Sequence, residues 1–200
     1  MDQVKRQYRQ TARADQVAAT RRRIVEAAVA LHSTVGPANT TLSAVAREAG
    51  VSRPTLYAHF PDEATLFQAC TMHSMAQNPP PDLRAWLVID DPRDRVRTAL
   101  TELFSHYARN EQMIENVFRD MYVVESMREF NLPLVEASFE QMTEVLTSCF
   151  DDAPATARRR AALVALALSF DTWKLLARGR ALTNDEAAEL MTTVVVTSVA

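Results

Sequence analysis

Apolar residues in the first third of the chain recur every three or four positions, which is the spacing of one helix face. Residues 20–35 show this pattern, and we expect their inward positions to be Ile24, Ala27, Ala28, Leu31 and Val35. Gly36 and Pro37 follow. They predict the end of this helix, because glycine readily adopts a left-handed cap and proline cannot continue a helix.

Two shorter helical patterns lie within residues 41–60, on either side of a turn at Gly50. Thr41 and Ser52 stand where a side-chain oxygen can cap a helix N-terminus, and Pro54 suits the first turn of the second helix. Val51 can fill the angle between the two helices. Two capped helices around a glycine turn indicate a helix-turn-helix, whose second helix enters the major groove of DNA.

The rest of the chain shows further helical patterns with breaks at proline and glycine, and no strand-like alternation. We expect helices over residues 62–77, 91–109, 132–150 and 155–179 and from residue 183 onward, with a looser stretch at 111–130 and a break at 78–81. The predicted fold is all-α with about nine helices. A three-helix DNA-binding domain spans residues 20–61, and a helical domain spans residues 62–200.

Charge is distributed unevenly along the chain. Residues 1–60 hold nine Lys and Arg against four acidic residues, a net charge of +5, whereas the remaining 140 residues hold 13 basic and 21 acidic residues, a net charge of −8. A basic N-terminal part favours nucleic-acid binding, with a solvated basic helix face as the alternative. Residues 1–19 are predicted to be a basic arm. Both a disordered arm and an extension of the first helix stay open.

Composition and motifs exclude several classes of protein. The chain has only 3 Gly and 2 Cys, too few for a glycine-rich phosphate loop or a disulfide framework. It has no catalytic motif, no metal-ligand spacing among its four His, no apolar leader and no run that spans a bilayer. We therefore expect a cytoplasmic protein without catalytic residues, metal or cofactor. Two alternatives stay open: a redox-responsive regulator through Cys70 and Cys149, and an all-α enzyme without a recognisable motif.

The chain carries three stretches with continuous spacing from residue 20 to residue 67: TRRRIVEAAVALHSTVG, TTLSAVAREAGVSRPTLYAHF and PDEATLF. Together they resemble the DNA-binding domain of the tetracycline-repressor (TetR) family. The resemblance implies an all-α homodimer whose first three helices bind an operator. It also implies a variable C-terminal domain that binds a small effector and dimerises, joined to the DNA-binding domain by the helix at residues 62–77.

Two positions depart from the family pattern. Glu63 stands where the family usually has a lysine that meets a phosphate, and Ser43 stands where a basic residue is frequent. Both differences remove positive charge at the DNA edge. We expect each lost phosphate contact to weaken DNA binding, and we expect the basic N-terminal arm to compensate.

The predicted DNA contacts gather on the second helix of the helix-turn-helix and on the caps of both helices. Arg53 is expected to read bases, because an arginine can donate two hydrogen bonds to one guanine. Tyr57 and His59 are expected to meet phosphates or a thymine methyl group. The partner is double-stranded operator DNA, and the full set of contacts is Thr41, Ser52, Arg53, Pro54, Thr55, Tyr57 and His59.

Methionine and aromatic residues concentrate between residues 72 and 139, with polar residues among them. This mixture predicts a pocket for a small-molecule effector, with an ordinary core as the alternative. Release of DNA on effector binding, and hence repression, is our expectation, while activation or corepression stays open. The expected lining is Met72, Trp86, Phe104, Tyr107, Asn116, Met121, Tyr122, Glu125, Phe139 and Asp171.

The last two predicted helices carry apolar faces that are too wide for one-sided surface helices. They predict a four-helix interface in a homodimer, with burial inside one chain as the alternative. A two-fold dimer would place two recognition helices on a palindromic operator. The expected interface residues are Leu163, Leu166, Phe170, Trp173, Leu190 and Val194.

Overall fold

The structure is a computed structural model that describes residues 2–197, and that range consists of helices joined by turns and short loops. Among the first nine residues, only the side chain of Gln7 is described. The α-helices are α1 Asp2–Thr34, α2 Leu42–Glu48, α3 Arg53–His59, α4 Glu63–Gln77, α5 Leu83–Leu87, α6 Pro92–Asp120, α7 Glu125–Thr147, α8 Pro154–Leu168, α9 Phe170–Lys174 and α10 Asn184–Thr197. The all-α prediction is confirmed, with ten α-helices in the described range where about nine were expected.

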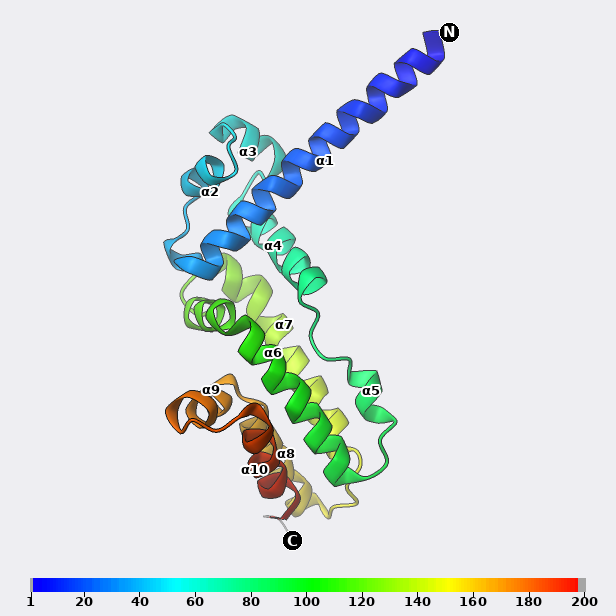
Figure 1. Ribbon diagram of the computed structural model, residues 1–200, viewed down its shortest axis with the longest axis vertical. Helices are drawn as coiled ribbons and strands as arrows, with labels where there is room; N and C mark the ends of the chain where they lie inside the picture. The colour runs from blue at the N-terminus through cyan, green and yellow to red at the C-terminus, as the bar shows by residue number, and fades with distance from the viewer. Residues whose placement is uncertain (1, 198–200) are drawn as a thin grey trace. The chain divides into compact units, whose positions relative to one another are not determined.

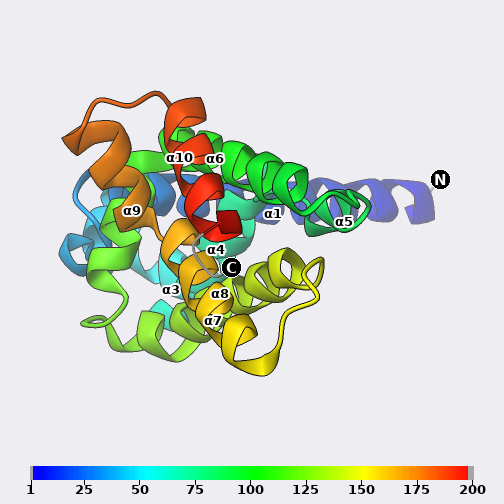
Figure 2. The same ribbon diagram turned by 90° about the horizontal axis from the view of Figure 1, so that it is seen from below.

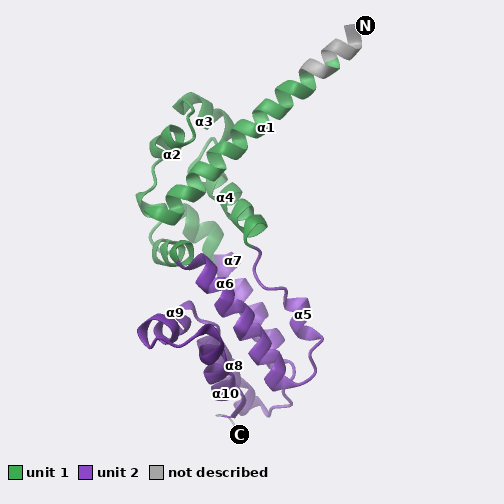
Figure 3. Cartoon of the chain, in the orientation of Figure 1, with its two compact units in different colours: residues 1–78, 112–132 green, residues 79–111, 133–200 purple. Residues whose placement is uncertain are grey.

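The chain divides into two compact units (Figure 3). Unit 1 comprises residues 1–78 and 112–132, and unit 2 comprises residues 79–111 and 133–200. Two helices belong to both units, since α6 passes from unit 2 into unit 1 and α7 passes back. The last part of α6 and the first part of α7 therefore fold with the N-terminal helices.

Unit 1 has a core formed where α1 packs against α2 and α4 (Figure 1). Val51 packs against this core from the turn between α2 and α3, as predicted. Val35 was expected to face inward, but it is 45% exposed because α1 ends one residue earlier, at Thr34. The buried core residues are Ile24, Val25, Ala27, Ala28, Val45, Ala46, Ala49, Leu56, Phe60, Leu66 and Cys70.

Unit 2 contains α8 and α10 side by side (Figure 2). The single helix predicted over residues 155–179 is wrong, because the chain leaves the helical conformation at Ser169 (φ −62°, ψ 134°). Ser169 then caps α9, and its side chain accepts a hydrogen bond from the Asp171 backbone N–H at 3.2 Å. The Tyr107 hydroxyl donates to the Leu168 carbonyl at 2.6 Å, which stabilises the break.

Two further helix boundaries differ from the prediction, and one helix is additional. The helix expected to end near residue 109 continues to Asp120 with a kink at Asn110 (φ −120°, ψ 17°). A helix was expected to open at Pro133, but α7 begins at Glu125 and carries this proline inside it. The short helix α5 was not predicted. Within residues 2–197, no helix is both long and apolar enough to cross a membrane.

Candidate nucleic-acid interface

The helix-turn-helix forms with the caps that the sequence predicts. The Thr41 hydroxyl accepts a hydrogen bond from the Ala44 N–H at 3.1 Å, and the Ser52 hydroxyl accepts one from the Thr55 N–H at 3.2 Å. Both caps satisfy backbone donors that a helix start leaves unpaired. Gly50 has φ +64° in the turn between the helices, a conformation that a residue with a Cβ rarely adopts.

Helix α3 presents an exposed face that begins at its first residue. Arg53, Pro54 and Tyr57 are exposed, whereas Leu56 is buried against the core. The Arg53 guanidinium has no hydrogen-bond or ion-pair partner among the described residues, so it is available to an external acceptor.

Two other predicted contact residues on α3 are already partly engaged. The Thr55 hydroxyl lies 2.8 Å from the Ser52 hydroxyl, and the Thr55 side chain is half-buried. His59 is also half-buried, and its backbone carbonyl accepts a hydrogen bond from the Arg21 guanidinium at 2.9 Å. The structure thus brings the candidate contacts of α3 and its cap onto one short element. Thr41 stands apart at the start of α2.

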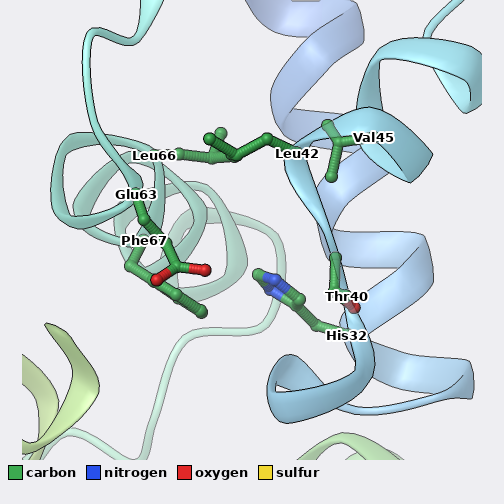
Figure 4. A pocket seen from close by; sticks show the side chains of 7 residues that line it. All are labelled: His32, Thr40, Leu42, Val45, Glu63, Leu66 and Phe67. Atoms are coloured by element: carbon green, nitrogen blue, oxygen red, sulfur yellow. The ribbon is translucent and has the colours of Figure 1, made fainter. Parts of the chain in front are cut away.

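The two positions that depart from the family pattern differ in their surroundings. Ser43 is exposed on α2. Glu63 is the first residue of α4, where a negative charge is favourable beside the positive end of the helix dipole. Glu63 also lines a small cavity, and its carboxylate extends toward the His32 side chain (Figure 4). The cavity has a volume of about 10 Å³, close to the room that one water molecule needs.

His32 is a buried histidine near the end of α1. It is 5% exposed, and its ring stacks on Phe67 with 4.9 Å between centroids. Burial lowers the pKa of His32 to about 4, although the negative charge of Asp120 acts in the opposite direction. The imidazole is therefore neutral at pH 7.

A buried polar network joins the end of α1 to the last part of α6, within unit 1. The Asn116 amide donates to the His32 and Ser33 carbonyls, both at 2.9 Å. These carbonyls belong to the last turn of α1, where a helix leaves acceptors unpaired. Asn116 itself is 1% exposed, so its amide takes the place of water as the hydrogen-bond donor to these carbonyls.

Asp120 completes this network at the turn after α1. Its carboxylate accepts the Ala38 N–H at 2.9 Å and a two-pronged contact from Arg119 at 2.7 and 2.9 Å. These hydrogen bonds lower the pKa of Asp120, and the bond from Arg119 has the largest effect. Gly36 passes beside the pair with φ +87°, and a Cβ there would collide with the Arg119 guanidinium. We call Asn116, Arg119 and Asp120 the 116–120 network. The sequence carries no local signal for it.

The candidate effector residues of unit 1 differ in burial. Asn116 and Met121 are buried, and the Asn116 side chain is used in the 116–120 network. Tyr122 and Glu125 are exposed near the start of α7. Met72 is exposed and lines an open groove of about 540 Å³ between α1 and α4.

The candidate effector residues of unit 2 are mostly part of its core. Trp86, Phe104 and Tyr107 are buried, Phe139 is half-buried, and Asp171 is exposed. None of these five lines either the small cavity beside His32 or the groove beside Met72. A shared effector pocket therefore stays a prediction.

The predicted dimer residues fall into two groups. Phe170 and Trp173 are buried inside unit 2 and pack against Tyr107, with ring centroids 5.3 and 5.9 Å away. Burial within one chain, the alternative left open above, describes these two side chains. The other four are exposed or half-buried on α8 and α10: Leu163, Leu166, Leu190 and Val194.

Neither cysteine has the environment of a reactive thiol. Burial raises the pKa of Cys70 to about 12, and burial also raises the pKa of Cys149. The thiolate is the form that reacts with oxidants, so these surroundings disfavour the redox-responsive alternative.

Comparison with known proteins identifies the N-terminal part of the chain. Residues 24–70 match the family model of bacterial regulatory proteins of the tetR family. This range covers the end of α1, the helix-turn-helix and the first half of α4. A comparison with curated proteins finds no match.

Solved structures share the fold over most of the chain. A TetR-like transcriptional regulator from Rhodococcus sp. RHA1 has a TM-score of 0.63 at 22% identity, over 89% of this chain and 94% of that one. NalD, the secondary repressor of the MexAB-OprM multidrug efflux pump in Pseudomonas aeruginosa, has a TM-score of 0.60 at 21% identity, over 90% and 95%.

At these identities the structural likeness shows the fold, and the family model supplies the assignment of the DNA-binding domain. The matched family and these neighbours are regulators and not enzymes, in agreement with the sequence prediction. Residues 24–70 are thus similar to the tetR family of bacterial regulatory proteins, and the chain as a whole shares the fold of solved structures of transcriptional regulators.

Proposed function

We propose that the protein is a homodimeric repressor that binds a palindromic operator through α3 and is released by a small-molecule effector. In this proposal residues 20–61 bind DNA in the cytoplasm, and residues 62–200 bind the effector and dimerise. The observation that carries it is the capped helix-turn-helix with the Arg53 guanidinium exposed and without a partner among the described residues. NalD, which has the same fold, is a repressor, and this favours repression over activation.

Dimerisation is supported by the apolar side chains on neighbouring helices α8 and α10. Leu166 is 52% exposed and Leu190 is 45% exposed. Two such helices from each of two chains would form a four-helix interface that buries these leucines. A two-fold axis there would present one recognition helix to each half of the operator.

Effector control needs a connection between the two units, and of the three places where the chain crosses the boundary (after α4, within α6 and within α7), two are our candidates. One is α4, which ends at the boundary of unit 1. The other is α6, which crosses the boundary directly after its kink at Asn110 and carries the 116–120 network. An effector that binds one arrangement of these helices more tightly than another would change DNA affinity by that difference.

Substitution of Arg53 tests base readout. Arg53→Ala is expected to remove about 1–3 kcal/mol of discrimination between operator and altered sites, because a paired arginine–guanine contact is lost. Tyr57→Phe, the matched control on the same helix, is expected to weaken binding to all sequences alike. Fluorescence anisotropy with operator and singly altered duplexes measures both. Equal weakening on every duplex by Arg53→Ala would assign this residue to phosphate contact.

The extension of α1 offers a second set of contacts. Residues 2–19 continue the helix, and the side chains of residues 10–18 are all exposed. Arg13→Gln is expected to reduce the slope of log affinity against log salt by about 0.9 if this residue neutralises one phosphate. Gln10→Ala, an exposed neutral change on the same extension, should leave the slope unchanged. A deletion of residues 1–19 that leaves operator affinity intact would remove the extension from the proposal.

A further inference from the structure

We infer that Arg21 is a positioning residue for the recognition helix. It holds the C-terminal end of α3 against α1, and it thereby sets the orientation in which Arg53 meets the bases. The inference rests on the proposed function of α3 as the recognition helix.

The hydrogen bond of Arg21 lies at the C-terminal end of α3. This helix has only seven residues, and the next residue, Phe60, already has an extended backbone (φ −138°, ψ 94°). The last carbonyls of a helix have no partner within the helix. Arg21 Nη1 donates to one of them, the His59 carbonyl, at 2.9 Å. Its positive charge also suits the negative end of the helix dipole.

Arg21 also covers the residue that anchors this end of α3. The Cζ atom of Arg21 lies 4.1 Å from the centroid of the Phe60 ring, and Phe60 is fully buried. The planar guanidinium can lie over the ring while its N–H groups reach the carbonyl at the edge. A lysine ammonium has the charge but lacks this planar set of donors.

The other end of α3 is attached through the turn after α2, where Val51 packs against the core and its N–H donates to the Ala46 carbonyl at 2.9 Å. It follows the turn at Gly50, which has φ +64° and lies in open space, since a Cβ added there would meet no atom within 4 Å apart from its chain neighbours. The orientation of α3 therefore depends on the Val51 turn at its start, on Leu56 and Phe60 in the core, and on the Arg21 contact at its C-terminal end. The contact spans 38 positions in sequence, so it fixes α3 to a different helix and not merely to its neighbours.

The two neighbouring arginines provide controls for the loss of charge. Arg22 forms an ion pair with Glu26 at 3.6 Å on the same helix. Arg23 is exposed, and it forms no hydrogen bond or ion pair with α3 among the described residues. Arg23→Gln therefore removes the same charge from the same turn of α1 without removing the bond to His59.

The experiment compares full-length Arg21→Gln, Arg21→Lys and Arg23→Gln on a duplex selected by the wild-type protein and on a scrambled duplex. We expect Arg21→Gln to lower the ratio of the two affinities roughly tenfold, in line with the loss of one charge-assisted hydrogen bond at an exposed site. Arg21→Lys should keep the salt dependence but not restore the ratio. Arg23→Gln should leave the ratio unchanged.

Hydrogen exchange in the free protein adds a readout that does not depend on DNA. The amides of residues 57–60 should exchange faster in Arg21→Gln than in Arg23→Gln. Phe60→Leu, which retains an apolar anchor but removes the ring under the guanidinium, should give a smaller increase.

Equal effects of Arg21→Gln and Arg23→Gln on both duplexes and on exchange would overturn the inference, because Arg21 would then act only as a surface charge. If the wild-type protein prefers no DNA sequence, the proposed function is overturned, and so is the role of Arg21 in base recognition. If the expected difference in hydrogen exchange is then still seen, Arg21 remains a structural contact between α1 and α3. The two failures are thus distinguishable.

Discussion

Asp120→Ala is expected to lower the free energy of unfolding of unit 1 by about 2–3 kcal/mol. The substitution removes the buried carboxylate that accepts the Ala38 N–H in a part-buried hydrogen bond, and a hydrogen bond to a charged group contributes about 1.5–3 kcal/mol. It also removes the carboxylate that orients Arg119 beside Gly36. Urea unfolding followed by circular dichroism measures the change.

The matched control for Asp120 is Glu129→Ala. Glu129 is an exposed acid in the part of α7 that belongs to unit 1, and surface substitutions of this kind usually change stability by less than about 0.5 kcal/mol. Asp120→Asn should be intermediate, because an amide oxygen can still accept from Ala38 but carries no charge for Arg119. If Asp120→Ala and Glu129→Ala have the same midpoint, the 116–120 network does not stabilise unit 1.

Acidification from pH 6.5 to pH 4 is expected to remove about 3 kcal/mol of stability through His32. The pKa of His32 is about 4 in the folded chain, against 6.5 for an unperturbed histidine. Between these values the unfolded chain binds the proton and the folded chain does not, so stability falls as pH falls. A shift of this size corresponds to about 3 kcal/mol at 1.36 kcal/mol per unit of pKa.

His32→Phe isolates this contribution. A phenylalanine keeps an aromatic ring against Phe67 but cannot take up a proton. The variant should lose less stability than the wild-type protein between pH 6.5 and pH 4, in denaturant titrations at a series of pH values. The same pH dependence in both proteins would contradict this account, because it would show that His32 takes up a proton as readily in the folded chain as in the unfolded chain.

Structure could be predicted from the sequence where it is determined by residues that are neighbours in the chain. The caps at Thr41 and Ser52 and the turn at Gly50 are local, and all three are confirmed. Each depends on a preference of one residue type for one backbone position, so spacing alone reveals it.

Structure could not be predicted from the sequence where it is determined by residues that are distant in the chain. Asn116 pairs with carbonyls more than 80 positions away, and no pattern around residue 116 indicates those partners. Pro133 was interpreted as a helix start, yet it lies inside α7. Phe170 and Trp173 were expected at a dimer interface, because a single-helix pattern does not show that the helix ends before Ser169 and that both rings contact Tyr107.

Selection of DNA from a random library by the purified full-length protein tests the proposed function most directly. We expect one enriched inverted repeat, with half-sites separated by about one helical turn or a multiple of it, bound by two chains. The protein should bind a duplex with one altered half-site much more weakly. Enrichment of no sequence, or of a single half-site bound by one chain, would contradict the proposal that two copies of α3 read a palindromic operator.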